Sequence, residues 1–220
     1  MTLPILYSFR RCPYAMRARL AVWRAGITCE LREVLLRDKP VSMIDYSSKA
    51  SVPVLVLTDG TVIDESLEII DWALAQNDPD GWLRPECGTF ADMQTLIAIN
   101  DGEFKEHLDG YKYSDRYADV DPAVHRRQGE RFLAELDRRI VENGKLFGST
   151  LSLADVSIVP FVRQFANVNR DWFDDSNYDG LKIWLSDFLA LPLFESMMVK
   201  YAKWHEGDAQ TIIPAAILDS

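Results

Sequence analysis

The chain has 220 residues, which is enough for one large domain or two small ones. Hydrophobic residues make up 48% and charged residues 26%, a balance typical of folded globular proteins and too apolar for a disordered one. The formal net charge is −10, from 24 basic and 34 acidic residues. This charge argues against nucleic acid as a main partner, because phosphate binding needs a basic surface.

The chain contains three cysteines, Cys12, Cys29 and Cys87. An odd and widely spaced set does not fit a disulfide framework, and no C-x-x-C pair predicts a metal site. We also find no secretory signal and no apolar run of about 18 residues, so we expect no membrane span. We therefore expect a cytoplasmic protein whose thiols stay reduced.

Strand and helix patterns alternate in the first part of the chain. Apolar runs predict strands, and apolar residues at helical spacing predict helices. Asp59-Gly60 is typical of a hairpin turn, and Gly26 is suited to ending a helix. The predicted strands are residues 3–7, 28–35, 54–57 and 62–63, and the predicted helices are residues 13–25, 39–46 and 66–76. This order indicates a mixed sheet with helices packed on its faces.

Residues 77–81, Asn-Asp-Pro-Asp-Gly, are rich in turn formers and indicate a domain boundary. The chain beyond them has few strand signals and is predicted to be all-helical. The predicted helices there are residues 122–142, 154–168, 181–190 and 192–204. We therefore predict an N-terminal domain at 1–78, a linker at 79–89 and a helical domain at 90–220.

Cys12 lies between the first predicted strand and the first predicted helix. Pro13 suits the first helical position, which places Cys12 at the helix N-terminus, near unpaired N–H groups and the positive end of the helix dipole. Arg10, Arg11 and Arg17 add positive charge. Such surroundings lower the pKa of a thiol by about one to several units. We therefore interpret Cys12 as a reactive thiolate rather than a small buried hydrophobe.

The residue three positions after Cys12 is Ala15, so that position offers no second thiol to resolve a mixed disulfide. A monothiol mechanism follows, with a small external thiol as the resolving partner. Cys29, in a predicted strand, and Cys87, in the linker, lack the surroundings of Cys12. We interpret both as structural or incidental.

Two further features have a structural and a functional interpretation. Pro53 opens the third strand. A cis Val52–Pro53 bond would turn the backbone of Val52 outward beside Cys12, where a peptide-like thiol ligand could pair with it. A trans bond would simply start an edge strand. Glu65 and Ser66 open the following helix. They either serve as a cap alone or hold the charged amino acid end of a ligand.

Together these segments resemble the glutathione transferase family, and within it the cysteine-type, omega-like group. Residues 6–15 resemble the strand, loop and helix that carry the group's catalytic cysteine. Val52-Pro53 resembles the family's cis-proline step, Glu65-Ser66 its γ-glutamyl-binding pair, and residues 36–40 the segment whose lysine meets the glycine carboxylate of glutathione. The resemblance is specific over residues 5–75 and generic beyond about residue 90.

The resemblance implies a glutathione transferase fold, with an α/β thioredoxin-like N-terminal domain and an all-α C-terminal domain. It implies glutathione as co-substrate and Cys12 as the catalytic residue. The implied glutathione-binding residues are Lys39, Val52, Pro53, Glu65 and Ser66. It further implies thiol transfer, as deglutathionylation or dehydroascorbate reduction, on a small disulfide or electrophilic substrate, and a homodimer. Ser152 and Asp155 resemble the family's capping box, which serves stability.

No motif in the helical part fixes the second substrate. The candidates are aromatic residues that could equally be part of the core: Tyr111, Tyr113, Trp172 and Trp204. Three histidines have no spacing that predicts a metal or a catalytic triad, and we expect them to be solvated or structural: His107, His125 and His205.

Two other functions remain open. One is conjugation of glutathione to an electrophile, with Tyr7 or Cys12 stabilising the glutathione thiolate. Cys12 argues against it, because this thiol would tend to trap glutathione covalently. The other is a non-catalytic interaction protein of the same fold. An interaction protein of this kind would have lost its catalytic activity. The sequence argues against such a loss, because it retains Cys12, Lys39, Val52-Pro53 and Glu65-Ser66 together.

Overall fold

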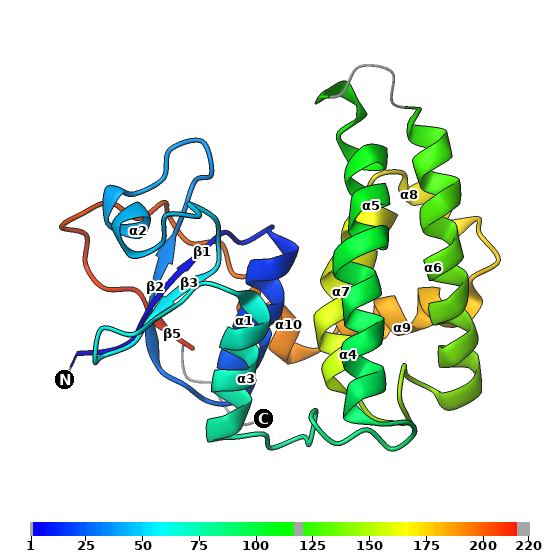
Figure 1. Ribbon diagram of the computed structural model, residues 1–220, viewed down its shortest axis with the longest axis horizontal. Coiled ribbons are helices and arrows are strands. Elements are labelled where there is room, and N and C mark those ends of the chain that lie inside the picture. Colours follow the sequence, from blue (N-terminus) through cyan, green and yellow to red (C-terminus); the bar gives the residue numbers. More distant parts are fainter. Residues whose placement is uncertain (1, 117–120, 215–220) are drawn as a thin grey trace. The chain divides into compact units, whose positions relative to one another are not determined.

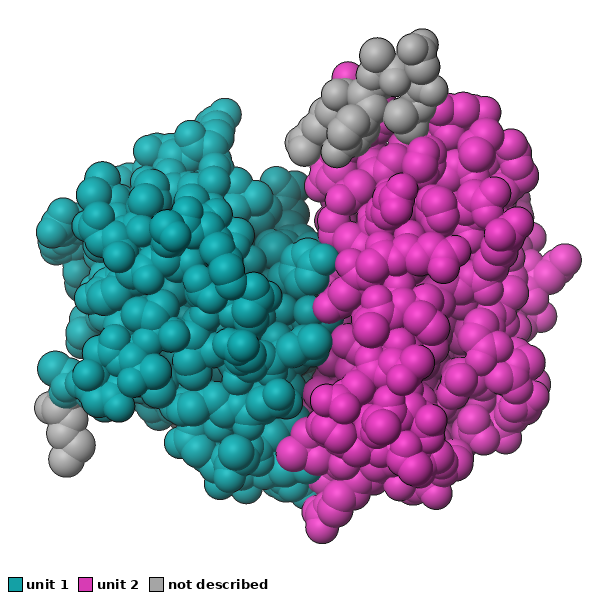
Figure 2. All heavy atoms as spheres, in the orientation of Figure 1, with its two compact units in different colours: residues 1–79, 191–220 teal, residues 80–190 magenta. Residues whose placement is uncertain are grey.

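The structure is a computed structural model that describes residues 2–116 and 121–214. The chain divides into two compact units, coloured separately in Figure 2. The first unit contains the chain up to Pro79 together with the segment from Leu191 onward. The second unit is Asp80–Ala190.

The first unit is built on a mixed five-stranded sheet in the order β4-β3-β1-β2-β5. The strands are β1 (Ile5–Ser8), β2 (Cys29–Glu33), β3 (Val54–Val56), β4 (Val62–Ile63) and β5 (Ile212–Ile213). β1 and β2 are parallel, and every other pairing is antiparallel. The central strands β1 and β3 are short apolar runs because helices cover both of their faces.

The elements predicted for residues 2–79 are confirmed with small changes at their ends. The helices of the first unit are α1 (Pro13–Arg24), α2 (Val41–Tyr46), α3 (Ser66–Gln76) and α10 (Pro192–Met197). Figure 1 shows α1 and α3 side by side on one face of the sheet, with α2 on the other. Gly26 follows α1 with a φ of +70°, a left-handed conformation that glycine adopts without steric cost.

The C-terminal segment differs from the sequence-based expectation. The predicted helix 192–204 ends at Met197, and the chain then returns to the sheet of the first unit instead of staying in the helical domain. The backbone N–H of Trp204 donates to the carbonyl of Glu33, and β5 pairs with β2. These pairings join residues about 180 positions apart, so local helical periodicity cannot reveal them.

The second unit is helical, as predicted. Its α-helices are α4 (Phe90–Ile99), α5 (Lys105–Lys112), α6 (Pro122–Asn143), α7 (Leu153–Ala166), α8 (Arg170–Asp174) and α9 (Asp179–Leu189). A π-helical turn, Asn100–Phe104, joins α4 to α5. Helix α7 contains Pro160 and is buried along most of its length, as its apolar sequence predicts. None of the helices in the described ranges has the length and apolar character needed to cross a membrane.

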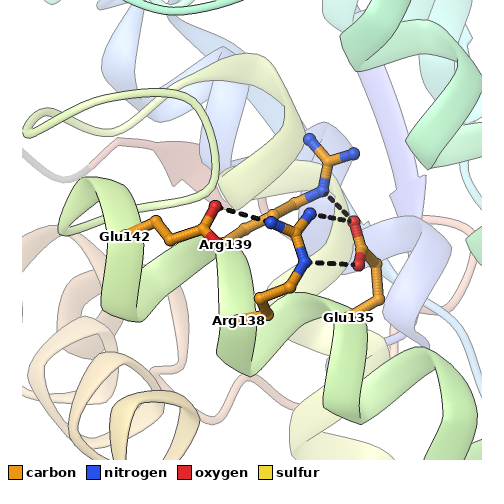
Figure 3. Close-up of polar contacts among 4 residues, drawn as sticks. All are labelled: Glu135, Arg138, Arg139 and Glu142. Atoms are coloured by element: carbon orange, nitrogen blue, oxygen red, sulfur yellow. Dashed lines mark hydrogen bonds and ion pairs between the residues drawn. The ribbon is translucent and has the colours of Figure 1, made fainter.

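The outer face of α6 carries an exposed network of charges (Figure 3). Arg138 bridges Glu135 and Glu142, at 2.9 Å and 2.5 Å, and Arg139 also contacts Glu135, at 2.7 Å. The carboxylates raise the pKa of Arg138 through these hydrogen bonds. Because these side chains are largely exposed, the pairs add little to stability.

Candidate functional site

Cys12 is the N-cap residue of α1, followed by Pro13 at the first helical position, as predicted. Its backbone N–H donates to the carbonyl of Phe9 at 3.0 Å, which closes the loop that carries the thiol. The first turn of α1 contains no acidic residue, so nothing in that turn offsets the positive end of the helix dipole. The thiol is half-buried against the apolar cluster around Tyr7, Met43 and Val52.

Val52 lies next to Cys12. The Val52–Pro53 bond is cis, the first of the two alternatives left open by the sequence. The Sγ of Cys12 lies 3.7 Å from the carbonyl oxygen of Val52, within reach of a sulfur hydrogen bond. The structure thus brings together the thiol and the backbone position expected to meet the central peptide of a ligand.

A buried ion pair supports the loop before Cys12. The guanidinium of Arg19, on α1, donates to the Oγ of Ser8 at 3.1 Å and to the carbonyl of Arg10 at 2.7 Å. Glu33, on β2, accepts from the backbone N–H of Arg10 at 2.8 Å and lies 3.9 Å from Arg19. Sequence patterns do not single out Arg19 or Glu33 as site residues. The available signal is a charged residue, Arg19, inside the apolar stretch 18–22.

Ser66 and Glu65 stand at the start of α3. Glu65 is the N-cap residue, but its side chain makes no capping hydrogen bond. The Oγ of buried Ser66 instead accepts from the Nε of Arg17, at 3.0 Å. The side chain of Arg17, which was expected to add positive charge near Cys12, therefore links α1 to the start of α3.

A lysine occupies the acidic side of this helix start. The Nζ of Lys49 lies 2.9 Å from Asp64 and 2.5 Å from Glu65, and Ser47 also donates to Asp64 at 2.6 Å. Hydrogen bonds from Ser47 and Lys49 lower the pKa of Asp64. The two carboxylates together therefore bind the ammonium group of Lys49.

Lys39 lies just before α2 and lines a pocket of the first unit with Val41, Lys203 and His205. Within residues 2–116 and 121–214, no carboxylate forms an ion pair with Lys39, whereas neighbouring Lys203 is paired with Asp38. Lys39 is therefore available to an anion from outside the chain.

Tyr7 is fully buried in the sheet, and its hydroxyl is already engaged. The hydroxyl accepts from Arg32 at 2.6 Å and donates to Ser42 at 3.0 Å. Arg32 also lies over the ring of Trp204, 4.2 Å from its centroid. This arrangement leaves Tyr7 poorly placed to hydrogen-bond a ligand thiol.

The aromatic candidates for a second-substrate wall separate into different units. Trp204 lies in the first unit and not in the helical domain, because the C-terminal segment returns to β2. Tyr111 and Trp172 both pack on Phe165 in the second unit, with ring centroids 5.0 Å and 6.1 Å away. Tyr113 lies beside Lys112. Tyr111 and Trp204 are thus largely core residues.

Two of the histidines are in contact. His107, on α5, and His125, on α6, face each other with their Nδ1 atoms 3.2 Å apart. The ring of His125 fits there because Gly110 has no side chain; a Cβ at that position would lie 2.5 Å from the ring. We interpret this pair as a helix-packing contact.

The first unit, a mixed sheet with a cysteine at the start of its first helix and a cis-proline beside that cysteine, followed by a helical unit, defines the two-domain glutathione transferase fold. Residues 6–82 match the family model for the glutathione S-transferase N-terminal domain, and residues 102–186 match the model for the C-terminal domain. The chain belongs to the glutathione transferase family.

Individual proteins of this family are also similar to the chain. A probable glutathione transferase of Aplysia californica is 45% identical over 58 residues, which are 26% of this chain and 62% of that protein, less than two thirds of its length. Glutathione S-transferase omega-1 of Rattus norvegicus is 23% identical over 88% of this chain and 80% of its own. A Pseudomonas fluorescens family member, solved with two glutathione molecules bound, has a TM-score of 0.76 at 16% identity, covering 89% of this chain and 92% of that chain.

Proposed function

We propose that this protein is a cysteine-type, omega-like glutathione transferase that catalyses thiol transfer by a monothiol mechanism. The observation that carries the proposal is the position of Cys12 at the N-terminus of α1, beside the cis Val52–Pro53 bond. A helix N-terminus and nearby arginines favour the thiolate, which is the nucleophile in disulfide exchange. The resemblance to the omega-1 enzyme supports this subtype.

Glutathione binds across the first unit in this proposal. Lys39 holds the glycine carboxylate, and the backbone at Val52 and Pro53 pairs with the central peptide as an added strand. Glu65 holds the γ-glutamyl ammonium, and Ser66 holds the adjoining carboxylate together with the N–H groups at the start of α3. The protein works in the reducing cytoplasm as a homodimer, with a small disulfide or electrophile as the second substrate.

The reaction is two successive disulfide exchanges. The Cys12 thiolate attacks the glutathione sulfur of a mixed disulfide, forms a Cys12–glutathione disulfide and releases the substrate thiolate. The thiolate of a second glutathione then attacks the glutathione sulfur, so that oxidised glutathione leaves and the Cys12 thiolate is restored. Each cycle converts the mixed disulfide and one reduced glutathione to the substrate thiol and one oxidised glutathione. Reduction of a dehydroascorbate-type substrate instead consumes two reduced glutathione molecules, which supply the two electrons and leave as one disulfide.

A substitution series tests this function. Cys12→Ser should abolish deglutathionylation of a glutathionylated peptide, because serine forms no disulfide. Cys87→Ser, at an exposed cysteine, should leave the rate unchanged. A Cys12→Ser variant that retains full activity on the peptide would contradict the proposal and favour conjugation. Failure of the wild-type protein to bind immobilised glutathione would instead favour a non-catalytic interaction protein.

A further inference from the structure

We propose that Arg19 is a positioning residue for Cys12: with Glu33 it clamps the loop that carries the thiol, and its buried positive charge favours the ionised thiol. This inference rests on the proposed function, because it assigns a task to a residue behind the same thiol. Arg19 acts through the loop, because its guanidinium donates to Ser8 and to the carbonyl of Arg10.

Hydrogen bonds of Arg19 and Glu33 hold the loop before Cys12 in place. Arg19 lies two helical turns after Cys12, and its side chain runs back toward the helix N-terminus, as long side chains on helices do. One guanidinium nitrogen donates to Ser8 and another to the carbonyl of Arg10, while Glu33 accepts from the N–H of Arg10. Ser8 and Arg10 flank Phe9, and the Arg19–Glu33 ion pair therefore fixes both of them. The carbonyl of Phe9 in turn accepts from the N–H of Cys12.

The pair is a poor device for stability alone. The side chain of Arg19 is 2% exposed and that of Glu33 is 12% exposed, and their closest charged atoms are 3.9 Å apart. The Nε of Arg19 and the Oε2 of Glu33 are buried and have no hydrogen-bond partner among the described residues. A buried ion pair with unpaired polar atoms costs more desolvation than a well-packed apolar pair would. The arrangement is better explained by a task at the site.

Charge is the second part of that task. Burial lowers the pKa of Arg19 to about 10, while the charges of Glu33 and Cys12 oppose this shift, so Arg19 stays protonated at neutral pH. Arg10 and Tyr201 are the other titratable groups that act on Arg19. Because a Coulomb attraction is mutual, the positive charge of Arg19 also favours the ionised thiol. Glu33 partly neutralises that charge and therefore moderates the effect.

The experiment measures the pH dependence of Cys12 alkylation by iodoacetamide in a Cys87→Ser background. Burial raises the pKa of Cys29 to about 12, so Cys29 does not compete. Arg19→Met should raise the apparent pKa of Cys12 by about one unit, the usual effect of losing a nearby charge. Glu33→Gln should move the pKa in the opposite direction, and Arg19→Lys should restore most of the wild-type value.

Arg138→Met, at an exposed arginine of α6, is the matched control and should leave the pKa of Cys12 unchanged. If Arg19→Met and Glu33→Gln only lower thermal stability, and the thiol pKa stays fixed in both, Arg19 is merely structural and the inference is wrong. If Arg19→Met does not fold, the sign of the Glu33→Gln shift still decides. A wild-type thiol that is acidic yet forms no glutathione disulfide would instead contradict the proposed function.

Discussion

The guanidinium of Arg32 donates a hydrogen bond to the hydroxyl of Tyr7 at 2.6 Å, and the same hydroxyl donates to Ser42. Arg32 is fixed in turn by Glu30, at 2.7 Å, and by the ring of Trp204. A tyrosine near the end of the first strand is therefore part of the internal support of the sheet. This contact distinguishes the two chemical mechanisms considered for the protein.

Tyr7→Phe should leave thiol transfer within about twofold of the wild-type rate, because the hydroxyl acts on Arg32 and Ser42 and not on a ligand. The variant should lose about 1 kcal/mol of unfolding free energy, since the Arg32 donor keeps its desolvation cost without its partner. Steady-state kinetics and urea denaturation measure the two effects. A folded variant with more than a tenfold loss of activity would favour the tyrosine-based conjugation mechanism.

The buried carboxylate of Asp155 organises the core of the second unit. It accepts hydrogen bonds from the backbone N–H and the hydroxyl of Ser152, from the N–H of Leu146 and from the indole of Trp184. Asp155→Asn should cost about 3 kcal/mol of unfolding free energy. The NH2 group of asparagine would face two hydrogen-bond donors and could not accept from either of them. Urea denaturation gives the value.

Asp92→Asn is the control for that substitution, since Asp92 forms a similar capping box with Thr89 at an exposed helix start. Its cost should be about 1 kcal/mol or less, because water can replace the lost partners. Equal effects of Asp155→Asn and Asp92→Asn would show that the buried network adds nothing beyond a surface cap.

Lys49 pairs with Asp64 and Glu65, so a γ-glutamyl ammonium that binds Glu65 as proposed has to displace it. Lys49→Met should therefore tighten glutathione binding several-fold, as isothermal titration calorimetry would measure. Binding of a glutathione analogue that lacks the α-amino group should gain nothing from the substitution. Weaker glutathione binding by Lys49→Met would show that Lys49 contacts the ligand favourably instead of competing with it.

The same cluster predicts a pH dependence of stability. Ser47 and Lys49 lower the pKa of Asp64 below its value in the unfolded chain, which is about 3.9. The stabilisation is therefore fully present above that value and is lost as the pH falls through the lower, folded-state pKa. Lys49→Met should lose less stability than the wild type on acidification from about pH 5 to pH 2. An identical loss in thermal scans of both proteins would contradict this account.

Local sequence signals predict the elements of residues 2–79 well because their determinants are local. The Asp59-Gly60 turn, the Pro13 helix start and the apolar runs of β1 and β3 each specify their own element. The thiol at the helix N-terminus follows from the same signals, since Cys-Pro marks both the loop and the first helical position.

The remaining features depend on contacts that sequence periodicity does not carry. The helical pattern of residues 192–204 predicts that Trp204 belongs to the helical domain, whereas its N–H donates to Glu33 and its ring packs on Arg32 in the first unit. The pattern does not reveal Arg19 as a site residue, because its partners Ser8 and Glu33 lie on different strands. Only the fold places Arg19, Ser8 and Glu33 around the loop that carries Cys12.

Mass spectrometry of the intact protein incubated with oxidised glutathione tests the central claim most directly. We expect one added glutathionyl group, located on Cys12 by peptide mapping, absent from Cys12→Ser and removed by reduced glutathione. An unmodified Cys12, or an adduct that reduced glutathione does not remove, would contradict the proposed thiol transfer.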